Sequence, residues 1–144
     1  MTRRLRRLRE DSSGTSAMEF ALIAPMFIVM MLGVMQVGLW MHGYNGMRAV
    51  AAETSRYMTV EYQKGNRVSN YDVAVWARNT AIQSSYILDG GTVSTLVVDD
   101  ATQNIAGVTR KTLTMNYQMS SILGMIGIDA LDMSFSRPMF VKAA

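Results

Sequence analysis

The stretch EFALIAPMFIVMMLGVMQVGLWM, Glu19 to Met41, decides the architecture of this 144-residue chain. After the acid, the 22 residues from Phe20 onward carry no formal charge, and only Pro25, Gln36 and two glycines interrupt the apolar side chains. With a rise of about 1.5 Å per residue, this run forms a helix about 33 Å long, and a bilayer core is about 30 Å thick. The run therefore predicts a single transmembrane helix.

Positive charge is concentrated before this helix. Of the chain's 14 basic and 11 acidic groups, residues 1–14 hold five arginines and two acids, which leaves nine of each sign in the other 130 residues. Arginines before an apolar helix follow the positive-inside rule, which predicts a cytoplasmic N-terminus, although a solvated tail would carry the same charges. Because the remaining chain is neutral, it lacks the positive surface that phosphate contacts need, and no nucleic-acid partner is expected.

The basic start differs from an ordinary cleaved secretory signal. Such a signal has an apolar region of about 7–15 residues that ends near a small-x-small site. Here the nearest such site, Ala49-Val50-Ala51, lies well beyond the 22-residue run, whereas small and polar residues precede it at residues 12–16. A cut before the run would leave the helix on the product, and a cut at Ala51 would release a soluble product without it.

Residues 14–25, with the sequence GTSAMEFALIAP, resemble the processing site of TadE-like pseudopilins, small subunits of the tight-adherence branch of type IV pilus systems. The resemblance continues at residues 48–57, RAVAAETSRY, and extends loosely to the C-terminal strands. It implies that a prepilin peptidase cuts between Gly14 and Thr15. Glu19 and Phe20 then become the fifth and sixth residues of the product and are assigned to processing and assembly.

Pro25 matches the proline that this family carries near the start of its apolar run. A proline inside a helix removes one intrahelical hydrogen bond and bends the helix, which membrane helices tolerate. We therefore expect a helix kink at Pro25.

Two roles are open for Glu19. In the first, Ser16 and Glu19 form a capping box that begins the helix, with the carboxylate favourably placed in the helix dipole. In the second, cleavage gives Thr15 an α-amino group, largely protonated at neutral pH, and Glu19 pairs with this amine in its own or a neighbouring subunit. Loss of one partner of a buried ion pair costs about 3–5 kcal/mol. The resemblance favours the second role.

The rest of the sequence predicts a small α+β body. Helical spacing persists after the apolar run, so one helix is expected from about residue 16 to about residue 60, followed by an exposed loop at residues 63–70. Asn70 is expected to cap a second helix that ends at residues 89–91. Strands are expected at residues 92–98, 108–119 and 131–137, the last ending before Pro138, with a short helix or loop at residues 121–128.

The predicted fold class is therefore α+β. A long N-terminal helix, transmembrane in its first half, packs on a small domain with a second helix and an antiparallel sheet of about three strands. The domains are a basic leader at residues 1–14, a transmembrane helix at residues 15–44 and an extracytoplasmic domain at residues 45–144.

Residue sets typical of catalysis or metal binding are missing from the sequence. His42 is the only histidine and there is no cysteine, so one chain cannot form a histidine cluster or a thiolate site. The paired carboxylates Asp99-Asp100 and Asp129 with Asp132 have ordinary roles in turns and at strand ends. We expect no enzymatic activity, no cofactor and no metal.

The resemblance implies a minor pilin or pseudopilin of the bacterial inner membrane, with a cytoplasmic N-terminus, a periplasmic C-terminal domain and incorporation into a surface pilus. Its expected partners are a prepilin peptidase, other pilins and pseudopilins, the platform proteins and assembly ATPase of the pilus machine, and the lipid bilayer. The alternative is a permanently anchored single-pass protein whose periplasmic domain binds a ligand or partner and never polymerises.

Overall fold

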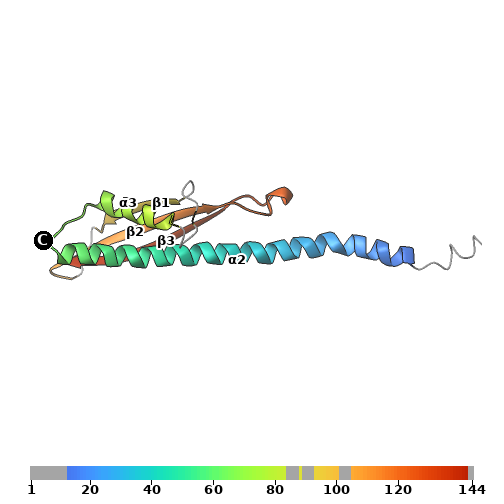
Figure 1. Ribbon diagram of the computed structural model, residues 1–144, viewed down its shortest axis with the longest axis horizontal. Coiled ribbons are helices and arrows are strands. Elements are labelled where there is room, and N and C mark those ends of the chain that lie inside the picture. Colours follow the sequence, from blue (N-terminus) through green and yellow to red (C-terminus); the bar gives the residue numbers. More distant parts are fainter. Residues whose placement is uncertain (1–12, 84–87, 89–92, 101–104, 143–144) are drawn as a thin grey trace, which may run out of the picture.

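The computed structural model describes residues 13–83, 88, 93–100 and 105–142. Its longest element is helix α2, Ser13–Gln63, whose 51 residues span about 77 Å at 1.5 Å per residue. The N-terminal half of α2 projects away from the rest of the molecule, and a second helix and a sheet lie along its C-terminal half (Figure 1). This arrangement confirms the predicted α+β fold with one long N-terminal helix.

The two halves of α2 differ in their surroundings. In the C-terminal half, Met47, Val50, Ala51 and Met58 are fully buried against the body, at the helical spacing that the sequence predicts. In the N-terminal half, apolar side chains all around the helix are exposed, from Met18 to Met41. One helix therefore contributes buried residues to the core of the body and also carries an exposed apolar segment. This segment, residues 18–41, is here named the apolar rod.

The second helix, α3 (Asn70–Ala81), begins one residue earlier than predicted. Ser69 is its N-cap, and the Ser69 hydroxyl accepts a hydrogen bond from the backbone N–H of Asp72. The expectation that Asn70 caps this helix is therefore wrong, because the Asn70 amide donates to Asp99 at the end of the first strand instead, at 3.0 Å. The helix ends at Ala81 with Ile82 as its C-cap, so the prediction that it continues to residues 89–91 is wrong. Residues 89–91 themselves lie outside the described residues.

Three antiparallel strands form one sheet in the order β1 (Val93–Asp99), β2 (Val108–Met119) and β3 (Leu131–Lys142). Along β2, the side chains of Leu113, Met115, Tyr117 and Met119 are buried, which confirms the predicted alternation. The predicted end of the third strand before Pro138 is wrong, because β3 continues to Lys142. As an edge strand, β3 tolerates a proline whose missing N–H is not needed for pairing.

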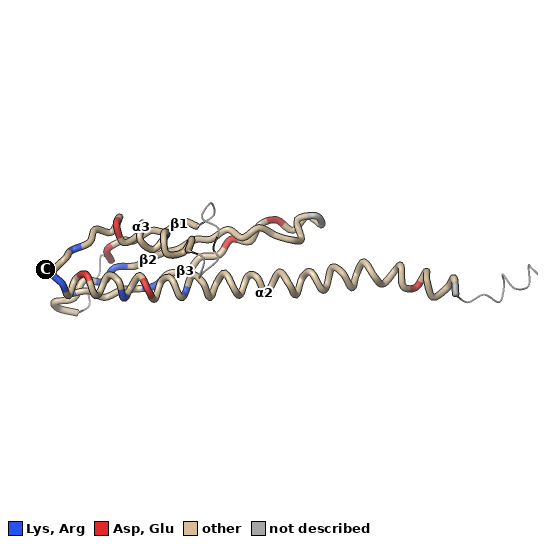
Figure 2. Tube along the Cα trace, viewed as in Figure 1, with Lys and Arg blue, Asp and Glu red and all other residues tan. Residues whose placement is uncertain are grey.

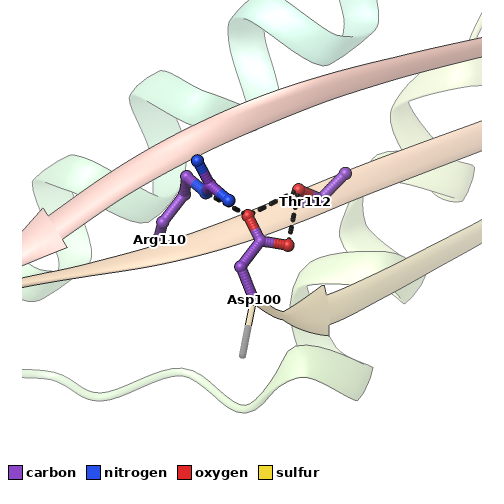
Figure 3. Close-up of polar contacts among 3 residues, drawn as sticks. All are labelled: Asp100, Arg110 and Thr112. Carbon is purple, nitrogen blue, oxygen red and sulfur yellow. Dashed lines mark hydrogen bonds and ion pairs between the residues drawn. The ribbon is translucent and has the colours of Figure 1, made fainter. Parts of the chain in front are cut away.

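Two carboxylates join the end of β1 to β2. The Asp100 carboxylate accepts from Arg110 Nε and also from Thr112 Oγ1, at 3.0 and 3.1 Å to its two oxygens (Figure 3). Beside it, Asp99 pairs with Lys111 at 2.8 Å, and the hydrogen bond from Lys111 holds the pKa of Asp99 below its ordinary value. The Lys111 residue is only 7% exposed, so this pairing compensates the cost of burying its charge.

Gly43 allows α2 to approach the sheet closely. A Cβ at this position would lie 3.1 Å from Met133 Cε and 3.2 Å from Tyr117 Cε1, which is shorter than an ordinary van der Waals contact. The next residue, Tyr44, stacks on Trp40 and contacts the Phe135 ring edge-on, with centroids 5.7 Å apart in both pairs. The glycine therefore serves packing between α2 and the sheet.

We expect the Gly43→Leu variant to lower the free energy of unfolding of the body by about 1–3 kcal/mol, because the added side chain forces β2 and β3 away from α2. The matched control is Gly38→Leu, since Gly38 lies on the same helix with nothing within 4 Å of an added Cβ. Denaturant unfolding in detergent micelles, followed by tryptophan fluorescence, measures both variants. Equal stability of the two would contradict the packing role.

Candidate processing and assembly site

The predicted site residues Gly14, Thr15, Glu19, Phe20 and Pro25 all lie on the first turns of α2, and all are exposed. A Cβ added at Gly14 would have no neighbour within 4 Å, so the glycine serves no packing contact among the described residues. The scissile bond predicted between Gly14 and Thr15 is helical, which means that a peptidase must unwind the start of α2 to reach it.

The predicted capping box at Ser16 and Glu19 is wrong for the uncut chain. Because α2 already begins at Ser13, both residues lie inside the helix and neither takes the N-cap position. The Glu19 carboxylate also has no hydrogen bond or ion pair with any residue that the structure describes. The acid is therefore not used to begin the helix.

Thr15 and Glu19 lie four residues apart on α2, a spacing that places two side chains on the same helical face. If the chain begins at Thr15, its α-amino group lies at the positive end of the helix dipole, and a carboxylate one turn away offsets both charges. Since Glu19 is exposed, its carboxylate can reach either this amine or the amine of a neighbouring chain.

After Glu19, the next formally charged residue is Arg48. Figure 2 shows the resulting length of helix without a charge, between one acid near its start and the charged body. In this stretch Pro25 lies inside α2, and the helix continues on both sides of it. Among the described residues, α2 is the one helix long and apolar enough to cross a membrane, and only 6% of its most apolar segment is buried. It is compatible with a single-pass membrane anchor.

Gln36 has a structural role that was not predicted from the sequence. It lies inside the apolar run, yet it is only 4% exposed, because the connection between β2 and β3 covers it. Its side-chain Oε1 accepts a hydrogen bond from the backbone N–H of Ile122 at 2.9 Å, while its Nε2 has no partner among the described residues. The signal in the sequence was a lone amide in an otherwise apolar run.

Within the described part of the chain, no three histidine, cysteine or acidic side chains lie together so that they could hold a metal ion. A surface hollow of about 760 Å³ lies between the C-terminal end of α2 and the end of β3. Its lining includes two cations, Arg67 and Lys142, but no acid or histidine.

Residues 14–56 match the model of a protein family described as TadE-like protein. The chain has no match among curated proteins or among solved structures. The matched segment begins at Gly14 and ends in the C-terminal half of α2, so it includes all five predicted site residues.

Proposed function

We propose, from the TadE-like character of residues 14–56, that the chain is a minor pilin or pseudopilin subunit of a tight-adherence pilus used for surface attachment. In this proposal, the chain is made as a precursor with residues 1–14 in the cytoplasm. A prepilin peptidase cuts after Gly14, and the body, residues 45–144, lies in the periplasm. The family match itself supports involvement in the tight-adherence pilus system.

The observation that carries the proposal is the position of the family match on the structure. It begins at the glycine where the cut is expected, and it follows α2 through the exposed apolar rod into the body. A helix that is apolar on all sides suits a membrane, and after extraction the same surface can pack on the helices of other pilins. Small residues on the rod, Ala21, Ala24 and Gly33, permit close approach between helices.

The proposed partners are those that the subunit contacts in turn during its insertion, processing and assembly. The precursor is inserted in the bilayer of the inner membrane and is bound by the prepilin peptidase. The processed subunit then binds the platform proteins, the assembly ATPase and other pilins. Glu19 is proposed to pair with the new amine of Thr15 during assembly, and Phe20 lies beside it on the exposed rod with 72% of its surface accessible.

Intact-mass measurement of the protein purified from membranes tests the proposal. We expect a mass that corresponds to loss of residues 1–14, with Thr15 as the first residue, and the full-length mass in cells that lack the peptidase. An uncut chain in both strains would contradict processing and would support a permanently anchored protein with a periplasmic binding domain. A product that begins after Ala51 would contradict both.

A further inference from the structure

The connection between β2 and β3 reaches along the apolar half of α2. Residues 120–128, here named the β2–β3 tip, contain the short helix η1 (Gly124–Ile126). The β2–β3 end extends beyond the rest of the sheet in the direction of the N-terminal part of α2 (Figure 1). The hydrogen bond from the Ile122 N–H to Gln36 Oε1 fixes the tip beside the apolar run.

The position of this hydrogen bond along α2 indicates how deep in the bilayer the tip would lie. Gln36 lies five residues before Met41, the end of the apolar run, which corresponds to about 7.5 Å along a helix. If the run spans the bilayer, the contact lies about that far below the outer boundary of the hydrocarbon core. Segments that lie in a membrane interface bury their apolar faces by about 5–10 Å, so the tip reaches the same depth.

The composition of the tip suits this depth. Its nine residues carry no formal charge, and Ile122, Ile126 and Ile128 are 37%, 52% and 43% exposed. The first acids, Asp129 and Asp132, follow it, and Gln118 donates to Asp132 across the strands at 2.9 Å. An apolar end is thus followed by a polar rim, as expected for a segment that enters lipid only at its tip.

We propose that the β2–β3 tip enters the outer leaflet of the bilayer beside α2 and forms a second membrane contact, with acyl chains covering Ile122, Ile126 and Ile128. At Gln36 the apolar surface of the tip adjoins the apolar surface of α2 that faces lipid. Because the two surfaces are continuous, we infer that lipid covers the tip as well. The tip also shields the Gln36 amide, which would otherwise face acyl chains. The inference rests on the membrane anchorage in the proposed function, but it does not require pilus assembly.

Single-cysteine labelling of the full chain in lipid vesicles tests the proposal, because the chain has no cysteine of its own. An environment-sensitive fluorophore is attached in the variant Ile126→Cys. The matched control is Phe140→Cys, since Phe140 is equally exposed at 52% but lies near the opposite end of β3. The variant Met30→Cys, in the middle of the apolar run, reports on the anchor itself.

At position 126 we expect a blue-shifted emission in vesicles of phosphatidylcholine, with quenching by lipids brominated in the upper part of the acyl chain. Anionic lipid should not be required, because the tip carries no positive charge. The label at position 140 should remain water-exposed and unquenched, and the label at position 30 should be quenched by more deeply brominated lipids.

A quenched label at position 30 with an unquenched label at position 126 would overturn the second contact and leave the anchor intact. A lack of quenching at both positions would overturn the membrane anchorage as well. If the emission at position 126 is blue-shifted only at high protein density, and the shift is lost on dilution into excess lipid, the tip covers a second copy of the chain, which also overturns the proposal. None of these results depends on processing or on pilus formation.

Discussion

The Gly14→Ala precursor is expected to remain at its full length in membranes, with essentially complete loss of the processed form. Both Gly14 and Thr15 are part of α2, so a peptidase that cuts the bond between them must first draw this bond out of a helix. Alanine makes this harder, because it favours the helix by about 1 kcal/mol over glycine. It also places a Cβ beside the bond to be cut, where the resemblance assigns a glycine.

The fold gives no reason for this variant to fail in any other way. An added Cβ at Gly14 meets nothing within 4 Å, and the same is true at Gly33, which makes Gly33→Ala the matched control. Immunoblotting and intact mass of membrane protein should show the Gly33→Ala chain processed as in wild type. If Gly14→Ala is also cut at the wild-type rate after position 14, then the peptidase does not recognise this glycine.

The Glu19→Gln variant is expected to be processed normally but to enter the pilus at least about 100-fold less, since loss of one partner of a buried ion pair costs about 3–5 kcal/mol. Glutamine preserves the size of the side chain and its capacity for hydrogen bonds but removes the charge. In the single chain Glu19 is exposed and has no partner among the described residues, so its removal should leave the stability of the monomer unchanged. The expected loss therefore arises only when the helices are packed together.

The matched variant is Glu19→Asp, which keeps the charge and should restore part of the assembly. Processing is measured by intact mass and assembly by the amount of subunit in sheared pili, so the two steps are separated. Normal assembly of Glu19→Gln would reduce Glu19 to an ordinary helical residue. Failure of processing in this variant would instead place Glu19 in the recognition site of the peptidase.

Most of the secondary structure was predictable, because it follows from local periodicity. The apolar run and the stripe that follows it predicted one long helix, and the alternation in β2 predicted a half-buried strand whose bounds are confirmed. The error at Pro138 has a different cause. Whether a proline ends a strand depends on whether that strand lies at the sheet edge, and strand order is a property of the tertiary fold.

The same limit applies to the candidate site. The position of the site at the start of α2 followed from the sequence, but the role of Gln36 did not, because Ile122 lies 86 residues away along the chain. The packing role of Gly43 was not predictable either, because the side chains that it lies against, Met133 and Tyr117, come from two strands far along the chain. Long-range contacts of this kind leave no local pattern in the sequence.

The continuity of α2 has a mechanical consequence. Helix α2 is unbroken from Ser13 to Gln63, and its C-terminal half is part of the core of the body. When the body moves along the helix axis, the N-terminal end of the helix therefore moves by the same distance. A motor that lifts the body by about 33 Å, the length of the apolar run, withdraws the whole run from the bilayer by the same distance.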